Sequence, residues 1–140
     1  MQQESGHGDP MRVLIVEDEA ITALHLESLV SQLGYEVCSV EATGEGAVAA
    51  AAAHKPDLVL MDVRLAGELD GIAAACQIRR QFGIPSLLVT AYSDDRTKQR
   101  AEHCKTMGML SKPYTATQVE QMLARATTAL GGEMGGTCEA

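Results

Sequence analysis

Short, unbroken apolar runs that each end at a polar or charged residue constrain the fold of this chain most. They cover residues 12–16, 58–61, 86–89 and 109–111. Unbroken apolar runs are expected of central strands in a parallel sheet, because such strands are buried on both faces. Residues 35–40 alternate between apolar and polar side chains, which is typical of an edge strand. The sequence therefore predicts five strands.

Helical patterns fill the gaps between these strands. Apolar residues recur at helical spacing from Leu26 to Leu33, and Gly34 ends that helix. The other helices are predicted near residues 45–54, over 71–82, after Ser93 and from Thr115 onward. Ser93 is placed to cap the fourth helix, and the Thr115-x-x-Gln118 pattern forms a capping box for the fifth.

The fourth helix carries only a thin apolar stripe, which consists of Ala101, Cys104 and Met107. A helix that buries few apolar side chains is weakly anchored. We therefore expect this helix to move more easily than the other four.

A strand followed by a helix, repeated five times, predicts an α/β fold with a parallel sheet between two helical layers. The 140 residues suit one domain, and the core must be aliphatic because aromatic residues make up only 3% of the chain. Residues 11–130 are predicted to form this domain. Residues 1–10 and the glycine-rich residues 131–140 are predicted to be flexible ends.

Polar residues follow each central strand. Glu17, Asp18 and Glu19 follow the first run, and the later runs lead into Asp62, Thr90 and Lys112. Right-handed crossovers place the carboxyl ends of parallel strands at one edge of the sheet, where ligands bind in open α/β folds. We expect these side chains to converge there.

This set of side chains suits phosphoryl transfer. Asp18 and Asp62 can bind Mg2+ directly, with Glu17 acting through water, because Mg2+ prefers oxygen ligands. Asp62 can act as a nucleophile and form an aspartyl phosphate. Lys112 and the Thr90 hydroxyl would then meet the charge on the phosphoryl oxygens.

Each of these residues also has an ordinary interpretation when it is taken alone. An acid after a strand often caps a helix or forms a turn, a threonine suits any strand, and a lysine is usually solvated. The case for a site depends on their joint position after four separate strands.

Five short segments resemble the receiver domain of two-component response regulators. They are residues 16–19, 60–65, 70–71, 89–91 and 111–113. The resemblance extends over about residues 11–130. It implies a flavodoxin-like, doubly wound sheet of five parallel strands in the order 2-1-3-4-5, flanked by five helices.

The resemblance also implies roles for individual residues. Asp62 would accept a phosphoryl group from a sensor histidine kinase or a histidine phosphotransfer protein. Thr90 and Lys112 would contact the phosphoryl oxygens, and the Lys112–Pro113 peptide would be cis. Mg2+, the one cofactor, would be held by Glu17, Asp18, Asp62 and the backbone carbonyl of Arg64. The chain would then be a phosphoacceptor signalling domain and not an enzyme.

Some positions depart from the family pattern. Ala66 stands where a proline is common, and the loop from Leu65 to Asp70 looks one residue longer than usual. Met109 replaces the usual switch aromatic, and methionine packs flexibly but has no ring to flip. Arg64 and Tyr92 lie two residues beyond Asp62 and Thr90, and we predict that they tune the lifetime of the phosphoaspartate.

Charge and composition exclude several classes of protein. A net charge of -8 argues against direct nucleic-acid binding. The chain has no segment that could span a membrane and no signal peptide, so it is predicted to be cytoplasmic. Four cysteines without a CxxC pair predict reduced thiols, with Cys138 exposed in the tail.

The chain is predicted to signal by binding an unknown downstream protein, which contacts the fourth helix, fifth strand and fifth helix. Candidate contacts on that face, which could also form a homodimer, are Arg96, Lys98, Arg100, Lys105 and Tyr114. The chain is predicted to stand alone, and the alternative is a receiver cut from a larger response regulator or hybrid kinase.

Three other functions fit the sequence less well than phosphoacceptance. A phosphorylation-independent binding module conflicts with the intact set of acids, threonine and lysine. A Mg2+-dependent phosphatase with an aspartyl nucleophile commonly has a second Asp where this chain has Arg64. A flavin-binding domain conflicts with the acidic loop after the first strand.

Overall fold

The computed structural model describes residues 10–65, 67–91 and 94–139, with side chains described up to residue 130. The strands are β1 (Arg12–Val16), β2 (Glu36–Glu41), β3 (Leu58–Asp62), β4 (Ser86–Thr90) and β5 (Gly108–Ser111). The helices are α1 (Ala20–Gln32), α2 (Gly44–His54), α3 (Gly71–Phe82), α4 (Asp95–His103) and α5 (Ala116–Glu139). Each predicted element is present, but α1 begins at Ala20, before the predicted pattern, and α5 continues to Glu139, beyond the predicted end of the domain.

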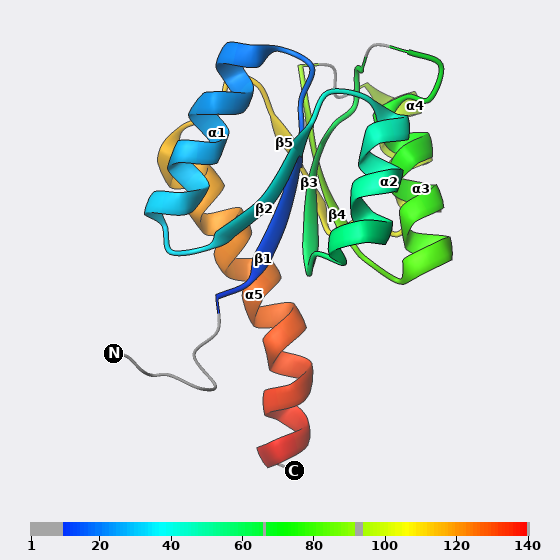
Figure 1. The fold of residues 1–140 in the computed structure, drawn as a ribbon. Coiled ribbons are helices and arrows are strands. Elements are labelled where there is room, and N and C mark those ends of the chain that lie inside the picture. Colours follow the sequence, from blue (N-terminus) through cyan, green and yellow to red (C-terminus); the bar gives the residue numbers. More distant parts are fainter. Residues whose placement is uncertain (1–9, 66, 92–93, 140) are drawn as a thin grey trace.

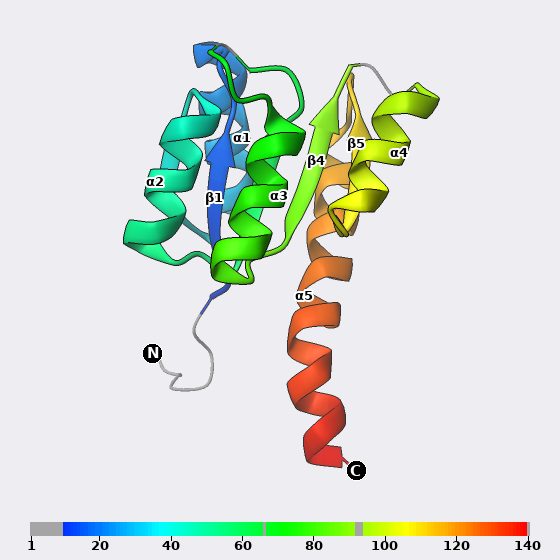
Figure 2. The ribbon, with the colours of Figure 1, turned by 90° about the vertical axis from the view of Figure 1, so that its right-hand side faces the viewer.

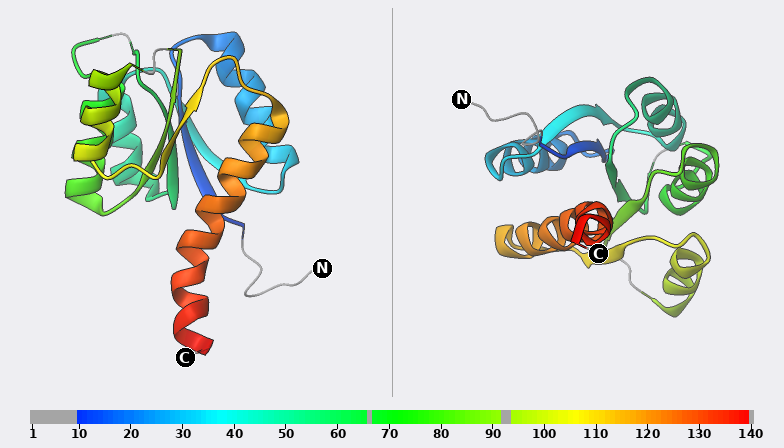
Figure 3. Two further views of the ribbon diagram at one scale, coloured as in Figure 1. Left: turned by 180° about the vertical axis from the view of Figure 1, so that it is seen from behind. Right: turned by 90° about the horizontal axis from the view of Figure 1, so that it is seen from below.

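The strands form one parallel sheet in the order β2-β1-β3-β4-β5, which confirms the predicted topology. Helices α1 and α5 cover one face of the sheet, and α2, α3 and α4 cover the other (Figures 1 and 2). The view from below in Figure 3 shows these two helical layers on either side of the strands.

An aliphatic core fills the space on both faces of the sheet. Leu14, Met61 and Leu88 pack toward α2 and α3, whereas Ile15 and Leu60 belong to the cluster beneath α1 and α5. Every residue of β3 and β4 is buried, as the unbroken apolar runs predicted. The edge strand β2 is only partly buried, in keeping with its alternating pattern.

The capping box of α5 is confirmed. The backbone N–H of Thr115 donates to Gln118 Oε1 at 2.8 Å, and the N–H of Gln118 donates to Thr115 Oγ1 at 3.1 Å. These reciprocal bonds satisfy N–H groups that a helix leaves unpaired at its start.

The predicted cap of α4 is wrong. Asp94 is the N-cap, and its Oδ1 accepts a hydrogen bond of 2.8 Å from the Thr97 N–H. Ser93 lies outside the described residues. A carboxylate caps well because its charge is also favoured at the positive end of the helix dipole. That hydrogen bond lowers the pKa of Asp94.

Helix α4 buries few of its own residues, and its apolar stripe differs from the predicted one. Ala101 is the one buried residue of the helix, and Cys104, which directly follows the end of the helix, is also buried. Both lie in the cluster beneath α2 and α3, whereas Met107 packs with the cluster on the opposite face. The helix ends at His103, so helical spacing no longer applies to Met107.

Helix α5 continues to Glu139 and therefore includes most of the segment predicted as a flexible tail. Its last turns extend beyond the sheet (Figure 1). Glycine disfavours helix, so the glycines in this segment gave no helical signal in the sequence. Among the described residues, no helix combines the length and the apolar character that crossing a bilayer requires.

Gly71 lies where α3 begins beside the end of β3. Its N–H donates to the Val63 carbonyl at 2.9 Å, and a Cβ at this position would overlap the carbonyl of Asp62. Backbone atoms cannot yield as a flexible side chain can, so the junction between β3 and α3 would have to shift. We expect Gly71→Ala to lower the free energy of unfolding by about 3 kcal/mol.

Gly83→Ala is the matched control for this substitution. Gly83 has a φ of 71° but no atom within 4 Å of an added Cβ, so only backbone strain of about 1 kcal/mol is expected. Urea denaturation measures both variants. Equal losses of stability would contradict the steric explanation at Gly71.

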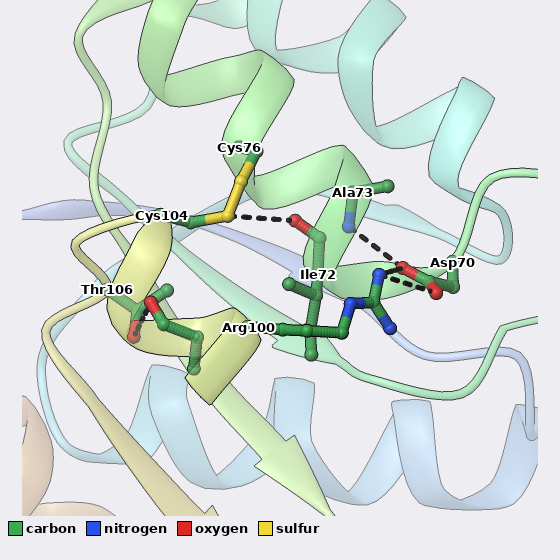
Figure 4. Close-up of a disulfide and its surroundings, with 8 residues drawn as sticks. Asp70, Ile72, Ala73, Cys76, Arg100, Cys104 and Thr106 are labelled. Carbon is green, nitrogen blue, oxygen red and sulfur yellow. Dashed lines mark hydrogen bonds and ion pairs between the residues drawn. A yellow bond between two sulfur atoms is a disulfide. The ribbon is translucent and has the colours of Figure 1, made fainter. Parts of the chain in front are cut away.

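The prediction of reduced cysteines is wrong for Cys76 and Cys104, which form a disulfide between α3 and the end of α4 (Figure 4). These cysteines lie 28 residues apart in the sequence, so their spacing gave no sign of a pair. Packing of α4 against α3 brings their Cα atoms to 4.9 Å, inside the usual disulfide range. Cys38 is free, and the side chain of Cys138 lies outside the described part.

Candidate functional site

The predicted polar residues meet at the carboxyl edge of the sheet. Asp62 and Thr90 are the last residues of β3 and β4, while Glu17 and Lys112 directly follow β1 and β5. Parallel pairing of β1 with β3, β3 with β4, and β4 with β5 brings these ends side by side. The expected convergence is therefore present.

Three carboxylates form the acidic part of the site. One carboxylate oxygen from each of Glu17, Asp18 and Asp62 lies within 4.8 Å of the others. Glu17 and Asp62 are only 3% and 6% exposed, whereas Asp18 is exposed. Grouped acids with little access to water repel one another strongly, so the site needs a compensating positive charge.

Lys112 supplies part of that charge. Its Nζ lies 3.0 Å from Glu17 Oε1 and 3.2 Å from Asp62 Oδ2, which links the segments after β1 and β3. The backbone N–H of Lys112 donates to the Thr90 carbonyl at 2.8 Å. Thr90 is fully buried, so this hydrogen bond helps to hold the backbone of Lys112 in place. The Lys112 ammonium reaches the two acids from that position.

Backbone donors hold the other carboxylate oxygens. The Glu19 N–H donates to Glu17 Oε2 at 3.0 Å, and the Arg64 N–H donates to Asp62 Oδ1 at 3.1 Å. Each buried acid thus has one oxygen on a backbone amide and the other on the Lys112 ammonium. Both carboxylates are held in fixed orientations before any ligand arrives.

The pKa values of the two partners reflect burial and charge together. Burial raises the pKa of Glu17, and this effect outweighs the hydrogen bonds from Glu19 and Lys112 that act to lower it. Burial acts to lower the pKa of Lys112, but the hydrogen bond to Glu17 and the charge of Asp62 outweigh it and raise that pKa. Lys112 therefore stays protonated at neutral pH.

A hollow of about 300 Å³ opens beside these acids. Its lining consists of Asp18, Glu19, Asp62, Arg64, Ala91 and Lys112. Several of these lining residues, Asp18, Glu19, Arg64 and Ala91, are exposed, so a small ligand can enter the hollow from solvent. Two of the three clustered carboxylates, Asp18 and Asp62, line this space, and carboxylate oxygens are donors that suit Mg2+.

Other predicted residues lie around the rim. The Lys112–Pro113 peptide is cis, as the resemblance implied, and burial raises the pKa of the half-buried Tyr114. Met109 is partly buried and packs against the core cluster beneath α2 and α3. Ala66 and Tyr92, about which the sequence also made predictions, lie outside the described residues.

One interaction near the site was not predicted from the sequence. Arg100 Nη2 lies 2.9 Å from Asp70 Oδ2, which ties α4 to the start of α3. Asp70 also caps α3 by accepting from the Ala73 N–H at 2.8 Å. The sequence predicted a helix over residues 71–82, but no local signal could show which cation of α4 would reach Asp70.

Comparison with known proteins agrees with the resemblance seen in the sequence. Residues 13–124 match the family described as the response regulator receiver domain. The chain is 37% identical over 131 residues to the transcriptional regulatory protein PdtaR of Mycobacterium tuberculosis, with 89% of this chain and 63% of that protein covered. It is 34% identical to the phyllosphere-induced regulator PhyR of Methylorubrum extorquens, with coverage of 81% and 42%.

Solved structures show the same likeness. The signal receiver domain of a modulated diguanylate cyclase from Desulfovibrio desulfuricans is 34% identical, with a TM-score of 0.82 and coverage of 89% of this chain and 99% of that one. The chemotaxis protein CheY4 of Vibrio cholerae is 25% identical, with a TM-score of 0.77 and coverage of 84% and 98%. The chain spans less than two thirds of the length of PdtaR and of PhyR.

Proposed function

This chain belongs to the response regulator receiver family, and we propose that it signals by accepting a phosphoryl group on Asp62. The observation that carries this proposal is the position of Asp62. It is nearly buried at the end of β3, with one oxygen on the Lys112 ammonium and two further carboxylates close by. A nucleophilic acid, a fixed cation and an oxygen donor set are together what an aspartyl phosphate site requires.

In the proposed reaction an Asp62 carboxylate oxygen attacks the phosphorus atom of the donor. The bond from phosphorus to the donor nitrogen, or to the donor oxygen in acetyl phosphate, breaks, and the leaving group takes the electron pair. Lys112 Nζ, 3.2 Å from Asp62 Oδ2, is placed to accept charge from the phosphoryl oxygens. Thr90, at the end of the neighbouring strand, is proposed to donate to another of these oxygens.

Mg2+ would be held by Asp18, Asp62 and the backbone carbonyl of Arg64, with Glu17 assisting. The carboxylate oxygens that lie within 4.8 Å of one another support this assignment. When bound, Mg2+ offsets negative charge on the carboxylates and on the phosphoryl oxygens.

The wider setting is also proposed. The donor would be a sensor histidine kinase or a histidine phosphotransfer protein, and the response would pass to a protein partner in the cytoplasm. The exposed Lys98 and Lys105 are proposed contacts on the face formed by α4, β5 and α5, which could also form a homodimer. The exposed Arg96, another candidate, lines the hollow between α3 and α4. Arg100 is already paired with Asp70, so its availability depends on that ion pair.

Incubation with acetyl phosphate, followed by intact-mass analysis, tests the proposed function. With Mg2+ we expect the chain to gain the mass of one phosphoryl group, and with EDTA in place of Mg2+ we expect none. A second donor, a phosphorylated phosphotransfer protein, is tested in the same way with Mg2+. If the folded protein stays unmodified with both donors, the result would favour a phosphorylation-independent binding module. Rapid turnover of a generic phosphomonoester would favour the phosphatase alternative.

Arg64 is expected to protect the phosphoaspartate from water. Arg64 lines the hollow beside Asp62 and its side chain is exposed, so it can cover a phosphoryl group bound there. We expect Arg64→Ala to lose its phosphoryl group a few times faster than the unmodified sequence. Arg79→Ala, an exposed arginine in the last turn of α3, is the control and should leave the rate unchanged. Equal rates for both variants would contradict a role for Arg64.

A further inference from the structure

The link between α3 and α4 is covalent, although little else holds α4 in place. Ala101 is the one buried residue among the nine of this helix, and Cys104 follows as its C-cap. Arg100 pairs with Asp70, but both side chains are more than 40% exposed, and exposed ion pairs contribute little. The Cys76–Cys104 disulfide is therefore the strongest restraint on α4 (Figure 4).

The disulfide is also open to reaction. It lies in a hollow of about 580 Å³ between α3 and α4, whose lining includes both cysteines. Cys76 is only partly buried, whereas Cys104 is 8% exposed. Disulfides that solution thiols can reach are the ones that tend to be labile or regulatory, whereas buried ones are structural.

The rim of this hollow carries positive charge. Arg80, Arg96 and Arg100 line it together with His103, while Asp70 pairs with Arg100 and Asp94 interacts electrostatically with Arg96. Guanidinium groups around a small opening attract anions and raise their local concentration. A thiol that carries carboxylates would therefore reach this disulfide more often than a neutral one.

We propose that Cys76 and Cys104 form a reversible thiol–disulfide site that sets how firmly α4 is held, and that anionic low-molecular-weight thiols and their disulfides are its co-substrates. This site is separate from the carboxylate cluster, and its proposed chemistry does not depend on phosphorylation of Asp62. In the oxidised state α4 is tied to α3. In the reduced state this restraint is gone, and α4 is held by contacts such as those of Ala101, Cys104 and the exposed Arg100–Asp70 pair.

Reduction proceeds by two exchange steps. A thiolate attacks Sγ of Cys76, the more exposed of the two cysteines, and the protein S–S bond breaks with its electron pair leaving on Cys104, which takes up a proton. A second thiolate attacks the outer sulfur of the mixed disulfide, releasing the small disulfide and leaving Cys76 as a thiolate that is then protonated. Two small thiols are oxidised to one disulfide while the protein disulfide is reduced, and the reverse sequence reoxidises the protein.

Hydrogen–deuterium exchange tests the effect on α4 in the full chain, equilibrated with either oxidised or reduced glutathione. We expect the amides of residues 95–103 to exchange roughly tenfold more slowly in the oxidised protein than in the reduced protein. The exchange rates of the amides in β1 and β3 should be the same in both. Cys76→Ser and Cys104→Ser should each exchange like the reduced protein under both conditions. Cys38→Ser, which removes the free cysteine, should respond like the unmodified sequence.

Alkylation of thiols during reduction tests the site itself. Arg80→Gln and Arg96→Gln should each slow reduction by glutathione several-fold and leave reduction by neutral 2-mercaptoethanol unchanged. Equal exchange of α4 in the two redox states would overturn the proposal. So would free Cys76 and Cys104 thiols in folded protein equilibrated with oxidised glutathione. Equal effects of the arginine substitutions on both thiols would overturn the preference for anionic co-substrates.

Discussion

Asp62→Asn should abolish covalent phosphorylation of this chain, whichever phosphoryl donor is supplied. An amide lacks the nucleophilic oxygen anion that attacks phosphorus, so no acyl phosphate can form at this position. Asn has nearly the shape of Asp, and its side-chain oxygen can still accept the hydrogen bond of 3.1 Å from the Arg64 N–H. We therefore expect folded protein whose phosphoryl incorporation falls to background.

Asp57→Asn is the control for this substitution. Asp57 precedes β3 at the opposite end of the strand, where its Oδ2 accepts a hydrogen bond of 2.8 Å from the Arg12 N–H. The chemical change is the same but lies away from the carboxyl edge, so phosphorylation should proceed at the normal rate. Persistent phosphorylation of Asp62→Asn, measured by intact mass, would contradict the assignment of the acceptor.

Lys112→Met should slow phosphorylation by a factor of roughly 100, because it removes a fixed positive charge from beside the acceptor. It should also lower the free energy of unfolding at neutral pH by about 3 kcal/mol, because two nearly buried acids lose their cation. Nζ lies 3.0 Å from Glu17 and 3.2 Å from Asp62, so one ammonium compensates both carboxylates. Rates come from intact mass over time, and stability comes from urea denaturation.

The stability loss of Lys112→Met should depend on pH in a definite direction. Burial already raises the pKa of Glu17, so the folded state holds this proton more tightly than the unfolded state does. A raised carboxyl pKa favours folding below the unfolded value of about 4.3, and this contribution is lost as pH rises through the folded pKa. The variant and the unmodified sequence should therefore differ most at neutral pH and least near pH 4.

Lys112→Arg separates charge from geometry. It keeps a positive charge near Glu17 and Asp62, so we expect it to retain most of the stability that Lys112→Met loses. Its planar guanidinium differs in shape from the compact ammonium, so the phosphorylation rate should still fall. Unchanged stability and unchanged rate in Lys112→Met would contradict the role assigned to Lys112.

The arrangement of the site followed from the sequence because topology fixes it. Once β1, β3, β4 and β5 are parallel, the residues at their carboxyl ends, Glu17, Asp62, Thr90 and Lys112, must lie at the same edge of the sheet. The apolar runs carried that information because central strands are buried on both faces. The backbone donors from Glu19 and Arg64 could not be predicted, since they depend on loop geometry.

The errors concentrate around α4, where the sequence carries little burial signal. Its cap is Asp94, its stripe lacks Met107, and its following cysteine pairs with Cys76 on α3. A helix with one buried residue has no strong periodicity to fix its ends or its contacts. Its partners become visible only when the packing of α3 against α4 is known.

Locating the phosphoryl group within the chain tests the central claim most directly. After reaction with acetyl phosphate and Mg2+, borohydride reduces an aspartyl phosphate to homoserine, and mass spectrometry of peptides then identifies the modified residue. The proposed function predicts homoserine at position 62 and unmodified Glu17 and Asp18, although all three lie within the same cluster. Modification at Glu17 or Asp18, with Asp62 intact, would contradict it.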